Sequence, residues 1–100
     1  MATEQTTLIE ATIGGGTFTI EGINLRTLMS DKIGSISPGC CYITSSYNGK
    51  EIYHCFGATV FVDDNSLYIT SEDVSKAKEG LEKVLGSPLI PWSQSRYHQP

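Results

Sequence analysis

Hydrophobic and polar residues alternate along three stretches between residues 40 and 69, and two short polar turns separate these stretches. The first turn is Asn48-Gly49, a dipeptide that suits a two-residue type I′ hairpin loop because both of its residues need positive φ. The second is Asp64-Asn65. Because period-two alternation is typical of half-buried strands, the pattern predicts three antiparallel strands over residues 40–47, 50–62 and 67–69.

The two turns also predict which side chains share a face of the sheet. A two-residue loop at Asn48-Gly49 pairs Tyr42 with Cys55, and the second loop pairs Phe61 with Tyr68. The more apolar face, which we expect to form the core, then carries Cys41, Ile43, Ile52, His54, Phe56, Ala58, Val60, Val62, Leu67 and Ile69. The outer face carries Tyr42, Tyr53, Phe61 and Tyr68, in two patches roughly 20 Å apart. Gly57 is expected to let the long strand bend or bulge.

Two further strands are predicted before this region. Thr7 to Ile13 and the alternating stretch Thr17 to Ile23 flank three glycines, which favours a hairpin with a flexible glycine turn. A phosphate-binding loop would need the glycines to open a helix, and a strand pattern follows them instead. Residues 24–32 fit either a short helix capped by Asn24 or a strand.

An amphipathic helix follows the last strand. Val74, Ala77 and Leu81 recur at helical spacing, and Thr70 or Ser71 is expected to cap the first turn. Gly86 suits the left-handed position just after the helix.

Together these elements predict an α+β fold. It has two layers, with an antiparallel sheet of about five strands in the order β-β-(short α)-β-β-β-α and the C-terminal helix packed on one face. One hundred residues suit a single domain, which we place at residues 6–93, with a frayed N-terminus at 1–5 and a flexible tail at 94–100.

Composition narrows the classes of function. The chain has 11 acidic and seven basic residues, and the scattered bases do not favour a nucleic-acid-binding surface. No apolar run approaches the roughly 20 residues needed to span a bilayer, and the N-terminal residues do not resemble an export signal. Three cysteines, an odd number, do not predict a disulfide framework. We therefore expect a cytoplasmic protein with reduced thiols.

Cys40, Cys41, His54 and Cys55 have side chains that can bind zinc. The predicted register places Cys40 and Cys55 on one face and Cys41 and His54 on the other, so the four cannot converge on one ion. Cys41 and His54 would be diagonal neighbours in the core, where a thiol is inert. We therefore expect no metal, no cofactor and no catalytic residue.

The outer aromatic residues are the remaining candidates for function. Tyrosine and phenylalanine among neutral residues are typical of the centre of a protein interface. We expect a non-enzymatic protein-binding module that binds its protein partner, or a second copy in a homodimer, through Tyr42, Tyr53, Phe61 and Tyr68. Small acidic chains of this type are often adaptors, or viral or mobile-element inhibitors of host complexes. The alternative is a small-ligand-binding protein or enzyme subunit with a pocket between helix and sheet, formed by His54, a cysteine and a tyrosine.

Overall fold

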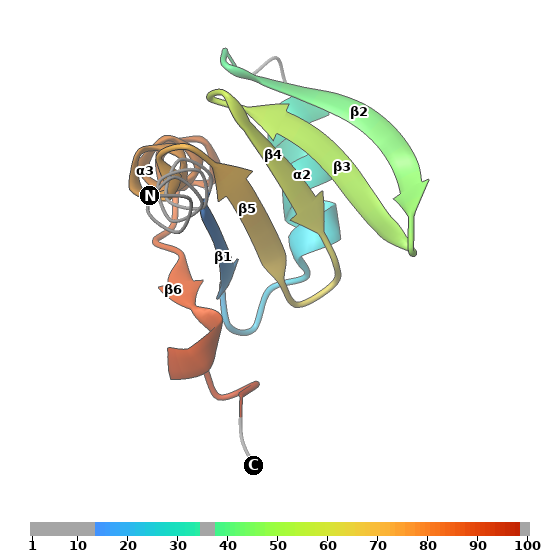
Figure 1. Cartoon of the computed structure of the whole chain (residues 1–100). Coiled ribbons are helices and arrows are strands. Elements are labelled where there is room, and N and C mark those ends of the chain that lie inside the picture. Colours follow the sequence, from blue (N-terminus) through green and yellow to red (C-terminus); the bar gives the residue numbers. More distant parts are fainter. Residues whose placement is uncertain (1–13, 35–37, 99–100) are drawn as a thin grey trace, which may run out of the picture.

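A six-stranded antiparallel sheet with two helices forms the protein (Figure 1), in a computed structural model that describes residues 14–34 and 38–98. The order of the strands across the sheet is β2-β3-β4-β5-β1-β6. The strands are β1 (Gly14–Thr19), β2 (Cys40–Tyr47), β3 (Lys50–Cys55), β4 (Ala58–Val62), β5 (Leu67–Ser71) and β6 (Ile90–Pro91). The helices are α2 (Leu25–Gly34), α3 (Val74–Leu85) and the 3-10 turn η1 (Trp92–Gln94). The predicted α+β fold is confirmed, and no helix in the described part of the chain is long and apolar enough to cross a membrane.

Both helices contribute to a core on one face of the sheet, and Figure 1 shows α2 behind the strands. Alternate residues of β4 and β5 point toward this core, as period-two side-chain geometry requires. The buried hydrophobic residues form one cluster: Phe18, Ile20, Leu25, Met29, Tyr53, Cys55, Ala58, Val60, Val62, Leu67, Ile69, Ala77, Leu81, Leu85 and Leu89.

Helix α3 ends where its sequence pattern indicates, but it begins at Val74, later than predicted, and its cap is a different residue. Asp73 is the N-cap, since its Oδ1 accepts a hydrogen bond of 3.1 Å from the backbone N–H of Lys76. The predicted caps Thr70 and Ser71 are wrong because both residues still belong to β5. Gly86 ends the helix at φ 74°, which confirms the predicted left-handed position.

Residues 24–32, which fit either a helix or a strand, lead into helix α2. Asn24 caps this helix, and its Oδ1 accepts a 3.0 Å hydrogen bond from the N–H of Thr27. Leu25 and Met29 lie one turn apart and are completely buried. The helix therefore packs on the core in spite of its weak amphipathic pattern.

The three consecutive glycines lie inside strand β1 rather than in a turn. This strand pairs with β5 on one side and with β6 on the other. A Cβ atom on Gly16 would lie 2.9 Å from the ring of Phe18, so the missing side chain makes room for a core aromatic. The predicted glycine turn is therefore wrong, and the strand predicted at Thr7 to Ile13 lies outside the described residues.

The largest departure from the predicted topology is a hairpin turn at Phe56 and Gly57. Both residues have positive φ, 52° and 78°, and Cys55 pairs with Ala58 across them. The stretch 50–62 is therefore two strands joined by a two-residue loop, and the expected bend at Gly57 is a full reversal. Because residues paired across such a loop share a face, Cys55 lies on the same side of the sheet as Ala58.

This reversal changes the faces of β2 and β3. Tyr47 pairs with Lys50 as predicted, but two irregularities in β2 shift the register so that Tyr42 pairs with Tyr53 and Cys40 with Cys55. Because Tyr53 pairs with Val60 and Cys55 with Ala58 across the Phe56-Gly57 turn, both side chains point into the core. The residues predicted to be buried from these two strands are exposed or half-buried: Cys41, Ile43, Ile52 and His54. The predicted pairing of β4 with β5 is confirmed, including Phe61 with Tyr68.

Phe56 is the residue whose ring lies against two glycines. A Cβ atom would lie 2.6 Å from the Phe56 ring at Gly39 and 2.7 Å from it at Gly80. Gly80 is in the middle of α3, where glycine ordinarily weakens a helix. Its place is explained by the aromatic ring that occupies the space of a side chain, and not by backbone conformation.

The C-terminal segment, expected to be loose from residue 94, makes contacts with the rest of the chain over its described part. The backbone N–H of Arg96 donates to Glu21, and the Tyr97 hydroxyl accepts from the N–H of Gly22 at 3.0 Å. Tyr97 also stacks on Trp92, with ring centroids 5.6 Å apart. These contacts connect the tail to the end of β1.

Candidate protein-interaction surface

The side of the sheet opposite α2 and α3 is called here the open face. Strand register defines two rows of side chains at its centre. The first row crosses β3, β4, β5 and β1 and consists of Ile52, Phe61, Tyr68 and Thr17. The second consists of Cys41, His54, Thr59, Thr70 and Gly15. Neither row contains any of the 11 acidic or seven basic residues of the chain, so the centre of the open face is poor in charge.

Phe61 and Tyr68 form an aromatic pair in the middle of this face. Their ring centroids lie 6.2 Å apart with the planes tilted by 37°. Phe61 is half-buried, whereas 41% of Tyr68 is exposed. A Cβ atom on Gly15 would lie 2.7 Å from Cζ of Tyr68, so the tyrosine ring rests on the bare backbone of β1. The glycine thus fixes the direction of an exposed aromatic side chain.

A hollow of about 280 Å³ lies beside this pair and is lined by Asn48, Lys50, Phe61 and Tyr68. Asn48 and Gly49 both have positive φ, 53° and 77°, which confirms the turn that the sequence predicts there. The turn brings an amide and a lysine to the edge of an aromatic pair from two other strands. The hollow therefore combines apolar walls with a positive charge at its rim.

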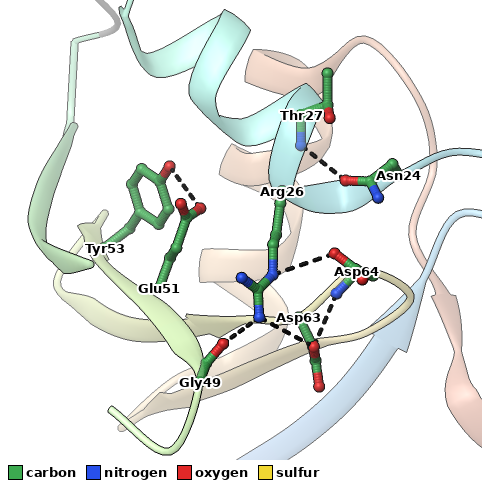
Figure 2. A network of polar contacts seen from close by, with 8 residues as sticks. All are labelled: Asn24, Arg26, Thr27, Gly49, Glu51, Tyr53, Asp63 and Asp64. Carbon is green, nitrogen blue, oxygen red and sulfur yellow. Dashed lines mark hydrogen bonds and ion pairs between the residues drawn. The ribbon is translucent and has the colours of Figure 1, made fainter. Parts of the chain in front are cut away.

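An arginine on α2 holds together the two loops that border this region (Figure 2). Arg26 donates to the carbonyl oxygen of Gly49, and its guanidinium lies 3.4 Å from Asp63 Oδ1 and 3.2 Å from Asp64 Oδ1. The N–H of Leu25 also donates to the Asp64 carbonyl at 2.8 Å. One side chain thus fixes the β2–β3 turn against the β4–β5 turn.

The Arg26 network has no signal in the sequence. Arg26 is one of several scattered bases, and Asp64 belongs to a predicted turn whose composition is ordinary. Arg26 and Asp63 are 37 residues apart along the chain, and neither hydrophobic periodicity nor turn composition relates residues at such a distance. Only the packing of α2 under the hairpins brings them together.

Tyr42 and Tyr53 pair on the opposite side of the sheet, facing the helices. Their rings meet edge to face with centroids 5.1 Å apart. Tyr53 is 2% exposed and donates its hydroxyl to Glu51 over 3.4 Å, whereas Tyr42, on the edge strand, is 45% exposed. Burial, reinforced by the negative charge of Glu51, raises the pKa of Tyr53 to about 12.

The four predicted interface residues therefore do not share one face. Phe61 and Tyr68 lie together on the open face, while Tyr42 lies on the helix side and Tyr53 is inside the protein. The expectation of two patches on a single outer face is wrong. The physical cause is the two-residue turn at Phe56 and Gly57, which exchanges the faces of β3 relative to β4.

The cysteines are also arranged differently from the prediction. Cys40 and Cys55 are joined by a disulfide, with Cα atoms 4.1 Å apart, so the expectation of reduced thiols is wrong for this pair. Cys41 is exposed and lies opposite His54 on the open face, instead of being buried in the core. Among the residues that the structure describes, no three His, Cys, Asp or Glu side chains are grouped to hold a metal ion.

The pocket of the alternative hypothesis is not assembled from its predicted residues. Two hollows of about 450 and 550 Å³ flank the ring of Phe56 beside α3. The first is lined by Phe56, Gly57, Thr70, Ser71, Glu72, Asp73 and Lys76. The second is lined by Pro38, Phe56, Lys76, Glu79, Gly80, Lys83 and Val84. His54, the cysteines and the tyrosines line neither hollow, and His54 faces away from the helices.

Comparison with models of protein families, with curated proteins and with solved structures finds no match for this chain. Its functional assignment therefore depends on the chemistry of its surface alone.

Proposed function

We propose that the chain is a non-enzymatic protein-binding module that covers part of a partner protein with the open face of its sheet. The observation that carries the proposal is the exposed, oriented ring of Tyr68 beside Phe61 at the centre of a charge-poor face. Aromatic residues with few charged neighbours are characteristic of the centres of protein interfaces.

The geometry of this face favours tight binding for two reasons. Tyr68 is held in place by its contact with the Gly15 backbone, so little side-chain entropy is lost when a partner covers it. The neutral rows around it can be desolvated without burying an unpaired charge. Lys50 at the rim of the hollow would favour a partner with a carboxylate next to its buried side chain.

The proposal includes the biological role and the assembly state. As an adaptor, or as a viral or mobile-element inhibitor of a host complex, the protein would act by masking a surface and would need no cofactor. Homodimerisation is part of the same proposal. A cytoplasmic location stays a prediction, and the Cys40–Cys55 disulfide weighs against it because cytosolic thiols are usually kept reduced.

Two tyrosines of similar exposure on opposite sides of the sheet provide a matched test. Tyr68→Ala removes the central ring of the open face, and Tyr42→Ala removes a ring from the helix side. Each tagged variant is compared with the wild-type protein in affinity capture from a cell lysate, with quantitative mass spectrometry of the bound proteins. Thermal unfolding of both variants controls for loss of structure.

We expect Tyr68→Ala to lose at least about tenfold of the captured partner, since a central interface tyrosine often contributes 2 kcal/mol or more. Tyr42→Ala should retain it. Equal capture by the two variants, or a loss caused only by Tyr42→Ala, would refute binding through the open face.

A further inference from the structure

The two edges of the sheet differ in how well they are protected against pairing with another strand. At one edge, β6 is two residues long and one of them is Pro91, which cannot donate a backbone hydrogen bond. At the other edge, β2 is eight residues long, CCYITSSY, with no proline and no charged residue. Within the described residues its strand partner is β3, on one side. Strand β2 therefore lacks the proline and the charged side chains that usually keep an edge strand from pairing with another chain.

The backbone groups that β2 presents outward follow from its pairing with β3. In antiparallel pairs, hydrogen-bonded and non-hydrogen-bonded residue pairs alternate, and the latter have the shorter Cα separation. The N–H of Phe56 donates to the Gly39 carbonyl at 2.8 Å, and the Cα atoms of Cys40 and Cys55 are only 4.1 Å apart. Cys40 and, two residues later, Tyr42 are thus in non-hydrogen-bonded pairs. Their own N–H and C=O groups point away from β3, toward the open edge.

We propose that a second copy of this chain pairs with this edge, with the two β2 strands antiparallel about a two-fold axis at Cys41. In this register Cys40 of each copy lies opposite Tyr42 of the other, and their outward N–H and C=O groups form four hydrogen bonds. The two Cys41 residues face each other across the axis. Their side chains lie on the open faces, which form one continuous surface in the dimer.

Charge favours a second copy as the occupant of this edge. Each chain carries a net charge of −4, so two copies repel unless they meet through neutral elements. A two-fold axis places a strand opposite itself, and any charge on it would face the same charge nearby. Strand β2 has none. The Cys40–Cys55 disulfide connects the strand to β3 beside the axis, so the edge is fixed before it pairs.

The inference specifies the interface of the dimer included in the proposed function, and it does not require that the open face bind a partner. Its test compares Tyr42→Pro with Tyr42→Ala. Both variants lose the same side chain, but only proline removes the outward N–H and fills its direction with a ring. Because this N–H points away from β3, the β2–β3 pairing is kept in both.

Sedimentation velocity over a dilution series measures the dimer dissociation constant. We expect wild type and Tyr42→Ala to dimerise with similar constants, and Tyr42→Pro to dimerise at least about tenfold more weakly, because two of four hydrogen bonds are lost. A monomeric wild-type protein, or equal constants for the proline and alanine variants, would overturn the proposal. Neither result would affect capture of a partner through Tyr68.

Cys41 supplies an independent measure of the register. Treatment with diamide should join two chains through Cys41, as the two thiols give up two protons and two electrons and the diamide N=N bond is reduced to a hydrazine. Non-reducing electrophoresis should show the linked dimer in wild type and Tyr42→Ala, and several-fold less of it in Tyr42→Pro. Cys41→Ser should keep the dimer in sedimentation, whereas loss of the dimer in this variant would contradict pairing through backbone groups.

Discussion

Replacing Gly80 with alanine tests the packing of the Phe56 turn on α3. In the middle of an ordinary helix this change stabilises a protein by about 1 kcal/mol. Here the new Cβ would lie 2.7 Å from Cδ2 and 2.8 Å from Cγ of Phe56. Since Cγ is next to the backbone, the ring cannot move aside by bending at its far end. Overpacking of this kind costs about 1–3 kcal/mol, so we expect Gly80→Ala to change the free energy of unfolding by between zero and about −2 kcal/mol.

Gly80→Ala should have the opposite effect on the free energy of unfolding once the ring of Phe56 is removed. Phe56→Gly is a suitable background because glycine readily adopts the φ of 52° found at this position. In that background Gly80→Ala should stabilise the protein by about 1 kcal/mol, which makes the coupling between the two positions about 1–3 kcal/mol. Urea unfolding of the four variants, with the disulfide kept oxidised, measures this cycle. A stabilisation of about 1 kcal/mol by Gly80→Ala in both backgrounds would refute the contact.

Two further predictions concern Tyr53 and the disulfide. The folded-state pKa of Tyr53, about 12, is above its ordinary value of 10.0, so the unfolded state loses this proton first and the stability should fall as pH rises from 10 to 12. Ultraviolet titration should show a tyrosine ionising near pH 12, and Tyr53→Phe should remove that step. Reduction of Cys40–Cys55, which closes a loop with a sequence separation of 15, should lower the free energy of unfolding by about 2–4 kcal/mol. Cys41→Ser should leave the effect of reduction unchanged, and an equal stability of the oxidised and reduced proteins would contradict a structural role for the disulfide.

The parts of the fold that could be predicted are those in which local chemistry and periodicity agree. Asn48-Gly49 and Asp64-Asn65 are good turn sequences, and both form turns at the predicted places. Helix α3 has a regular apolar stripe and a terminal glycine, and it ends where expected, although it begins two to three residues later than the predicted caps imply. These features depend on neighbours along the chain, which a sequence displays directly.

The faces of β2 and β3 could not be predicted because the decisive turn has an unusual residue. Phenylalanine rarely adopts positive φ, so Phe56-Gly57 does not resemble a hairpin turn in the sequence, and the alternation of residues 50–62 predicts one long strand. A two-residue reversal exchanges odd and even positions, and this one missed reversal therefore inverts the predicted side-chain directions of β3 and of β2, which pairs with it. The ring that stabilises this turn packs against Gly39 and Gly80, both distant in sequence.

Of the four aromatic residues predicted to share the outer face of the sheet, two lie together on the open face. Phe61 and Tyr68 depend on the second turn alone, which was placed correctly, and they lie together on the open face. Tyr42 and Tyr53 depend on the missed turn, and they lie on the other side; the two irregularities in β2 change their pairing but not their face. The role of Gly15 beneath Tyr68 has no local signature, because glycines in a strand resemble a loop.

Nuclear Overhauser contacts between Hα protons across β3 and β4 test the arrangement of the two faces most directly. Such contacts are strongest between residues in non-hydrogen-bonded antiparallel pairs, whose Cα atoms lie closest together. Cys55 and Ala58 form the hydrogen-bonded pair that closes the two-residue turn, so the next pair is of the non-hydrogen-bonded kind, and the register found here predicts a contact between His54 and Thr59, with Tyr53 in the core. If this contact is absent and residues 50–62 form one extended strand, β3 presents its other face, and the division into a core face and an open face described above would be wrong.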